Sequence, residues 1–166
     1  MRDEAIAAEL VVMAERDQAI RRRAATDRGV SPGILDRPHA ERLREIISRI
    51  GWPTRSRVGY AAEEAAWLIA QHAVHDPAFQ SRCLALLLEQ PASEVCPHHA
   101  AYLEDRINAL AGRPQRYGTQ LIERDGVLVP APLADETRVD ELRRSVGLGP
   151  LAEYVAGARA GRATPR

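Results

Sequence analysis

The sequence predicts a mainly α-helical protein of a single domain, with one small β-hairpin in its C-terminal third. Apolar residues recur at helical spacing in segments that are separated by glycine, proline or capping residues. One short stretch, 121–129, instead carries β-prone residues on both sides of Asp125-Gly126, a pair typical of tight hairpin turns. A chain of 166 residues is of ordinary size for one domain.

The first part of the chain predicts two amphipathic helices followed by a loop. Apolar residues at helical spacing predict a first helix over about 3–25. A second helix is expected over 39–50, entered through a capping side chain at Asp36. Gly51 is a typical residue for ending a helix, and the segment 51–59 is expected to be an irregular loop.

The third helix, predicted over about 60–74, is expected to lie at the centre of the fold. It is apolar on every side except at Gln71 and His72, and a helix that is apolar all round is buried. Four further helices follow from the same signals, over about 76–88, 98–111, 136–146 and 150–159. The chain beyond about residue 157 is expected to fray.

Composition limits the partners and the compartment. Basic and acidic residues balance at 23 each, so the chain has no net field to attract nucleic acid or an acidic membrane. No apolar run reaches the roughly 20 residues of a membrane span, and charged residues argue against a signal peptide. Cys83 and Cys96 form no disulfide framework, which favours a cytoplasmic protein with free thiols. The oligomeric state does not follow from the sequence.

Gln71 and His72 are the first candidate site, because polar groups in an apolar helix need hydrogen-bond partners. A buried polar group without a partner costs about 1–3 kcal/mol. His72 can act as a general acid or base while Gln71 orients the substrate. The alternative is that both belong to a structural hydrogen-bond network in the core.

Asp105 and Arg106 are the second candidate site. Neighbouring residues on a helix point about 100° apart, so these two need not pair with each other. Arg106 can clamp a carboxylate or phosphate with its planar fork of donors, and Asp105 can orient His72. The alternative is an ordinary surface or structural ion pair.

The segment 115–120 is the third candidate site. Gly118 permits a backbone bend that other residues resist. Around it, Gln115, Tyr117, Thr119 and Gln120 supply two amides, a phenol and a hydroxyl, each able to donate or accept. Loops in active sites carry such sets, but so does a capped turn that enters a hairpin.

No metal and no organic cofactor are predicted. His72 and His75 lie three residues apart, with His98 and His99 downstream, but a zinc site requires a fuller ligand set at a recognised spacing. Neither cysteine stands in a context that activates a nucleophile. A phosphate-binding glycine loop and a serine nucleophile elbow are also missing from the sequence.

Short motifs spread over most of the chain together resemble one bacterial family, catalogued as domain of unknown function 6624. The motifs are Gly51-Trp52-Pro53, Gln71-His72-Ala73 before Asp76-Pro77, Asp105-Arg106, the run from Gly112 to Gln120, and Val146-Gly147-Leu148 before Tyr154. The resemblance implies no reaction, substrate or cofactor. It implies that the polar residues of the three candidate sites recur as one set, and that an acidic residue often occupies the position of Val74.

The leading hypothesis is an enzyme that modifies a small molecule or peptide by acid–base chemistry, without an organic cofactor. The expected catalytic residues are His72, Asp105 and Tyr117, and the expected substrate-binding residues are Gln71, Arg106, Gln115, Thr119 and Gln120. Hydrolysis, elimination and cyclisation all fit this set. One alternative is a module that only binds a ligand or protein through the same pocket, and another is a purely structural network. We expect Gln71, His72, Asp105, Tyr117 and Gln120 to converge on one cavity.

Overall fold

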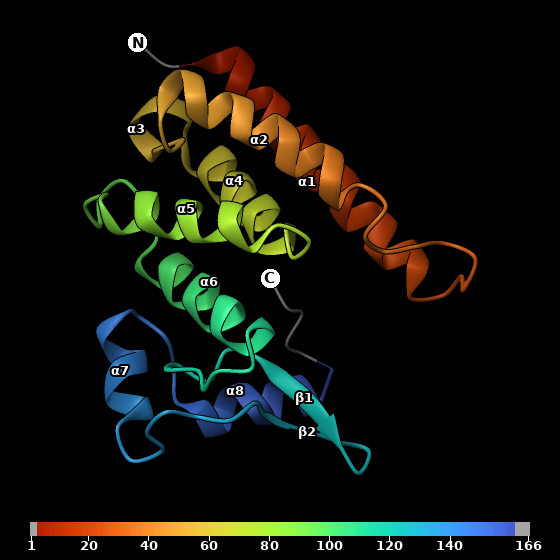
Figure 1. Cartoon of the computed structure of the whole chain (residues 1–166), viewed down its shortest axis with the longest axis vertical. Coiled ribbons are helices and arrows are strands. Elements are labelled where there is room, and N and C mark those ends of the chain that lie inside the picture. Colours follow the sequence, from red (N-terminus) through yellow and green to blue (C-terminus); the bar gives the residue numbers. More distant parts are fainter. Residues whose placement is uncertain (1–2, 162–166) are drawn as a thin grey trace. The chain divides into compact units, whose positions relative to one another are not determined.

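The computed structural model describes residues 3–161, which form eight helices and two strands (Figure 1). The helices are α1 (Glu4–Ala24), α2 (Asp36–Ile50), α3 (Arg55–Val58), α4 (Tyr60–His72), α5 (Pro77–Leu88), α6 (Pro97–Leu110), α7 (Val139–Ser145) and α8 (Leu151–Arg159), and the strands are β1 (Leu121–Arg124) and β2 (Val127–Pro130). The predicted fold class, mainly α with one small hairpin, is confirmed.

The chain falls into two compact units, one ending at Cys96 and the other beginning at Pro97. The first unit holds α1 to α5, and the second holds α6, the hairpin, α7 and α8. Each unit buries apolar side chains of its own. That the whole chain forms a single domain stays a prediction.

Helix α4 is the centre of the first unit, as its composition predicts. It packs against α1, α2, α3 and α5 (Figure 1). Alanine fills much of its surface and lets these neighbours approach closely, while Trp67 and Ile69 supply bulk. Only one polar residue before its last turn, Glu63, is fully buried among the described residues of α4.

Helix α1 lies against α4 with a stripe of four buried side chains. Ile6, Leu10 and Met13 form its apolar part, and Asp17 occupies the next position on the same face. The packing that buries this stripe therefore carries one carboxylate into the interior of the unit. An acidic side chain there requires partners, because an uncompensated buried charge is costly.

The ends of three helices can be compared with the sequence-based expectations. The expected loop at 51–59 contains the short helix α3, after Gly51 ends α2 with a φ of 71°. Asp36 does not cap α2: it is the first helical residue, and Leu35 holds the cap position without a side-chain hydrogen bond. Asp76 does cap α5, since its carboxylate accepts from the backbone N–H of Phe79 at 3.0 Å.

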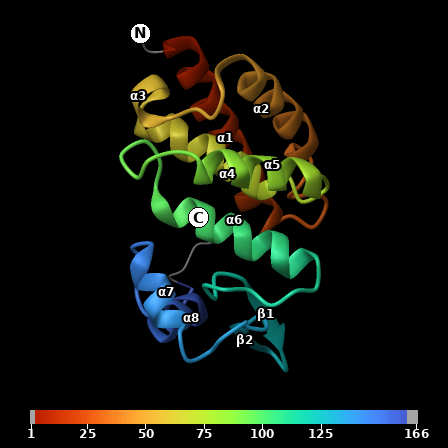
Figure 2. The same ribbon diagram turned by 60° about the vertical axis from the view of Figure 1, so that its left-hand side comes forward.

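The second unit is built around the hairpin and α8. Strands β1 and β2 pair antiparallel, with Leu121 opposite Pro130, and Asp125 and Gly126 both take positive φ at the turn. Helix α8 packs on β2, and the turn of the hairpin extends beyond it in both views (Figures 1 and 2). The expected fraying after about residue 157 does not include Arg159, which ends α8, and residues 162–166 lie outside the described chain.

Within residues 3–161, none of the helices is long and apolar enough to cross a membrane.

Candidate functional site

The last residue of α4 meets a carboxylate of α1. The Nδ1 atom of His72 lies 2.9 Å from Oδ2 of Asp17. The same carboxylate accepts from Nε of Arg21 at 3.1 and 3.2 Å and from the amide of Gln18 at 3.0 Å. A terminal nitrogen of Arg21 also pairs with Asp36 at the start of α2. Asp17, Arg21, Asp36 and His72, named the His72 cluster below, thus join three helices.

Asp17 is held in its charged form. Burial raises the pKa of this carboxyl, but the contacts with His72 and Arg21 outweigh burial and lower the pKa from 3.8 to about 2. A carboxylate beside Nδ1 favours the imidazole tautomer with its hydrogen on Nδ1, which leaves Nε2 as the proton acceptor. The side chain of His72 is 14% exposed and that of Asp17 only 3%, so the imidazole is the member of the pair that an external molecule can reach.

The contact between His72 and Asp17 has the length of a hydrogen bond but not its alignment. Nδ1 of His72 is buried and lies at ion-pair distance from the carboxylate, yet it makes no hydrogen bond of acceptable angle to any residue in the described part of the chain. Catalytic hydrogen bonds often have this property and tighten only when the substrate is in place.

Gln71, next to His72, is buried without hydrogen bonds from its side chain. The residue is 1% exposed, and neither its amide nitrogen nor its amide oxygen has a partner within residues 3–161. Its backbone oxygen is satisfied, since the amide of Gln80 donates to it at 3.1 Å. The structural alternative for Gln71, a saturated network in the core, is therefore not what its contacts show.

In the second unit, Asp105 of α6 is an anchor for the loop that enters the hairpin. Its two oxygens accept from the backbone N–H groups of Arg116, Tyr117 and Thr119 at 2.7 to 3.1 Å, and from the hydroxyl of Thr119 at 3.0 Å. These donors use the lone pairs that chemistry on a substrate needs. The contacts give Asp105 a structural role, and its expected catalytic role stays a prediction.

Gln115 has an equally complete set of partners. Its amide nitrogen donates to the backbone oxygens of Gln120 and Ala131 at 2.9 and 2.8 Å, and its amide oxygen accepts from the N–H of Gln120. The side-chain amide thereby links the loop to the backbone at the end of the hairpin. With its polar atoms engaged, Gln115 holds the loop, and substrate binding by it stays a prediction.

Arg143 of α7 and Gly118 fix the middle of the same loop. The buried guanidinium of Arg143 donates to the backbone oxygen of Tyr117 at 2.7 Å and to that of Gly149 at 2.6 Å. Gly118 has a φ of 67°, as its predicted role in a bend requires, and a Cβ there would stand 2.7 Å from a methyl group of Leu151. Burial raises the pKa of the Tyr117 phenol above its ordinary value.

Three of the expected substrate-binding residues do meet, in a cleft of the second unit. A cleft of about 250 Å³ is lined by Arg106, Thr119 and Gln120, together with Tyr154 of α8 and the apolar side chain of Leu128. The amide of Gln120 donates to the hydroxyl of Thr119, and the hydroxyl of Tyr154 donates to the backbone oxygen of Thr119. The cleft is small, and its lining combines polar side chains with apolar ones.

The structure therefore divides the expected site residues between the two units. Gln71 and His72 belong to the first unit, and those numbered 105 to 120 belong to the second. The convergence of all of them on one cavity stays a prediction. Val74, where the resemblance implies an acidic residue in other members, follows α4 and is 40% exposed.

Sequence reasoning missed the partners of His72. Asp17 carried a usable signal, because it continues the apolar stripe of α1 as a charged residue on a face that must be buried. Arg21 follows one turn later, where it can reach the same carboxylate. Asp36 was expected only as a helix cap, and its pairing with Arg21 over 15 positions follows from packing.

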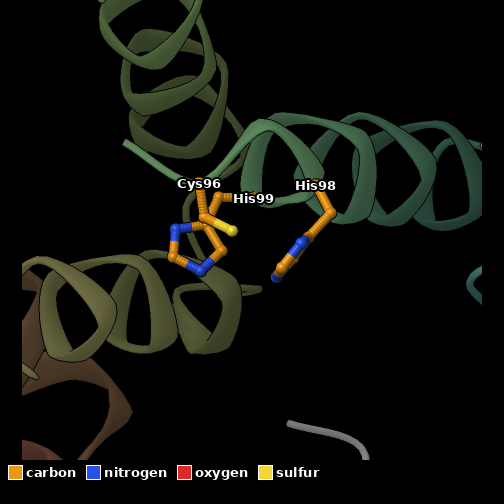
Figure 3. A group of neighbouring side chains, drawn as sticks. All are labelled: Cys96, His98 and His99. Carbon is orange, nitrogen blue, oxygen red and sulfur yellow. The ribbon is translucent and has the colours of Figure 1, made fainter. Parts of the chain in front are cut away.

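Two groups of side chains within the described residues have the donors and the spacing to hold a metal ion. In one, donor atoms of Asp17, Asp36 and His72 lie within 4.8 Å of one another, but Arg21 already supplies a positive charge to both carboxylates. The other group lies in the segment 96–99, at the start of α6, and combines a thiol with two imidazoles (Figure 3).

Comparison with known proteins identifies the family of the chain. The family described as Family of unknown function (DUF6624) matches residues 4–160, and the chain belongs to it. No curated protein matches the chain, and no solved structure does so either.

Proposed function

We propose that this member of the DUF6624 family is an enzyme that modifies a small molecule or peptide, with His72 as its general acid or base. The observation that supports this most directly is the 2.9 Å contact between Nδ1 of His72 and the buried carboxylate of Asp17. A buried carboxylate on one imidazole nitrogen orients the ring and stabilises the imidazolium that forms when the other nitrogen takes a proton.

The side-chain amide of Gln71, which has no hydrogen-bond partner among the described residues, supports a ligand-binding site at the end of α4. A buried amide without hydrogen bonds costs about 1–3 kcal/mol, and folding gains nothing from keeping it there. Proteins tolerate such costs where the group serves binding or catalysis. In this proposal a polar group of the substrate satisfies Gln71 while the neighbouring His72 transfers a proton.

Arg21 and Asp36 have a supporting role in this proposal. Arg21 shares the charge of Asp17 and ties it to Asp36, so the carboxylate keeps its position when the charge on His72 changes. In this proposal His72 transfers a proton while the ion pairs among Asp17, Arg21 and Asp36 hold the carboxylate in place. Hydrolysis, elimination and cyclisation all use such a group.

A second candidate function, ligand binding without chemistry, is favoured by the cleft of the second unit. Arg106 there offers a planar set of donors for a carboxylate or phosphate, and Gln120 adds an amide. The hydroxyl of Tyr154, which donates to the backbone oxygen of Thr119, also belongs to the lining of this cleft. A small anionic ligand fits this lining and the volume of the cleft.

Turnover of a mixed library of metabolites and short peptides, followed by mass spectrometry, distinguishes the two functions. We expect a specific substrate to be consumed by the parent protein, and the rate to fall by about 10²–10⁴-fold in His72→Gln and in Asp17→Asn. His75→Gln is the matched control, because His75 lies just after α4 and is exposed.

Turnover that survives in His72→Gln contradicts the enzyme proposal. Ligand binding without chemistry predicts a different result. A library compound should then raise the melting temperature of the parent and of His72→Gln equally, lose this effect in Arg106→Gln, and never be consumed.

A further inference from the structure

The turn that opens α6 brings a thiol and two imidazoles together in one continuous segment of four residues. Cys96 precedes Pro97, the first residue of α6, and His98 and His99 follow within the first turn. Figure 3 shows the sulfur of Cys96 between the two imidazole rings. One donor atom from each of the three residues lies within 4.8 Å of the other two.

These three side chains meet because the chain changes conformation at Pro97. Neighbouring residues on a helix point about 100° apart, so helix geometry by itself does not bring the side chains of His98 and His99 together. Their rings stand edge to face, with centroids 5.0 Å apart. Cys96 stands just before the helix, and its side chain lies beside the first turn, near both rings (Figure 3).

We propose that Cys96, His98 and His99 bind a divalent transition-metal ion of the zinc class. Thiolate and imidazole are the ligands that Zn²⁺ prefers, and three protein ligands with a fourth position left open are typical of catalytic zinc. No metal was predicted from the sequence, because His72, His75, His98 and His99 lack a fuller ligand set at a recognised spacing, and Cys96 was not grouped with them.

The geometry requires only a small contraction. Donor atoms around tetrahedral Zn²⁺ stand about 3.5 Å apart, given bond lengths of about 2.0 Å to nitrogen and 2.3 Å to sulfur. Rotation about side-chain bonds closes the remaining gap from 4.8 Å.

The electrostatics of the helix end favour the same occupant. A metal-bound thiolate places its negative charge at the N-terminus of α6, where the aligned peptide dipoles stabilise negative charge. His98 and His99 bind metal as neutral imidazoles. Metal binding therefore requires no positively charged imidazolium at the N-terminus of the helix. The ligands are partly exposed at Cys96 and His98, which gives an ion a path of entry.

Cobalt titration of the reduced full-length protein in metal-free buffer tests this proposal. Co²⁺ replaces Zn²⁺ in such sites, and a thiolate ligand gives a charge-transfer band in the near ultraviolet. We expect one equivalent of Co²⁺ to produce this band together with the visible bands of tetrahedral cobalt, and one equivalent of Zn²⁺ to remove both.

The chain itself supplies a matched control, because it contains two cysteines. Cys83 is buried in α5, and burial raises the pKa of its thiol to about 12, so it is a poor ligand. Cys83→Ala should keep the charge-transfer band, whereas Cys96→Ser should lose it. His98→Gln should weaken Co²⁺ binding at least tenfold, and circular dichroism verifies that each variant is folded.

Other outcomes overturn the proposal. They are a parent protein without the band, a band that persists in Cys96→Ser, and binding that is lost in Asp17→Asn but kept in Cys96→Ser. The last of these outcomes places the ion at the His72 cluster instead. None of these measurements uses catalytic activity, so the result is independent of the function proposed for His72.

Discussion

Asp17 of the first unit and Asp105 of the second are both buried carboxylates, but they have different partners. Asp105 accepts from three backbone N–H groups and one hydroxyl, all fixed by the fold of one loop. Asp17 accepts instead from the side chains of Arg21 and Gln18, and it lies 2.9 Å from the imidazole of His72. A carboxylate held by the backbone organises a loop, whereas one held by a titratable side chain can tune chemistry.

The buried glutamines show the same contrast. Gln115 of the second unit uses both ends of its amide in hydrogen bonds to the backbone. Gln71 of the first unit uses neither end, within the part of the chain that the structure describes. The loop of the second unit is thus a saturated network, and the end of α4 is not. This difference favours the end of α4 as the place where a ligand completes the structure.

The largest effect is expected from Asp105→Asn. The amide can accept at one atom only, so several backbone N–H groups of the loop lose their partner. We expect the free energy of unfolding to fall by about 3 kcal/mol or more, and the melting temperature by about 6–12 °C. Asp140→Asn is the control, because Asp140 accepts a single backbone N–H, from Leu151, at an exposed site. Equal losses in the two variants contradict the anchor role.

The second-largest effect is expected in how the free energy of unfolding depends on pH, because of Asp17. Its pKa in the folded protein, about 2, lies below the ordinary value of 3.8, so its contribution is complete above about pH 5 and is lost as pH falls. Urea unfolding of the parent and of Asp17→Asn measures it. We expect the advantage of the parent to shrink by about 1 kcal/mol between pH 6 and pH 3, and by about 2 kcal/mol at pH 2. Parallel curves for the two proteins rule this contribution out.

Replacement of single glutamines by methionine, which conserves volume, gives effects of opposite sign. Gln71→Met removes an amide without partners and should raise the free energy of unfolding by about 1 kcal/mol. Gln80→Met removes an amide that donates to the backbone oxygens of Ala70 and Gln71, and should lower it by about 1–2 kcal/mol. Chemical denaturation of both variants measures the two values. A destabilised Gln71→Met shows that the amide has a structural partner after all.

The fold was largely predictable, because periodicity and helix ends are local signals. The apolar surface of α4 predicted its central place, and Asp125-Gly126 predicted the hairpin. The short helix α3 was missed, since four residues are fewer than periodicity can detect. Asp36 was misread as a cap because the sequence does not show that its carboxylate pairs with Arg21 instead.

The candidate site was only partly predictable, because its partners come together through packing. Gln71 and His72 stood out as polar residues in an apolar helix, but nothing local connects His72 to Asp17, 55 positions earlier. In the second unit, Asp105 contacts the loop that carries the motif residues 115–120. Their roles were not predictable from the sequence. A side chain that hydrogen-bonds to the backbone of its own loop and a side chain that binds a ligand have the same sequence pattern.

The smallest effect on stability is expected from His72→Gln, and it distinguishes a site from a structural support. Asp17 keeps Arg21 and Gln18 as partners when the imidazole is removed, so no buried charge is left alone. We therefore expect a loss of at most about 1 kcal/mol, or about 2–4 °C in melting temperature, far less than for Asp105→Asn. His75→Gln, at an exposed position, should leave the melting temperature unchanged. A loss for His72→Gln as large as that for Asp105→Asn makes His72 a structural support, and the contrast between the two carboxylates then fails. A small loss together with abolished turnover assigns the imidazole to chemistry, because the fold then has little need of it.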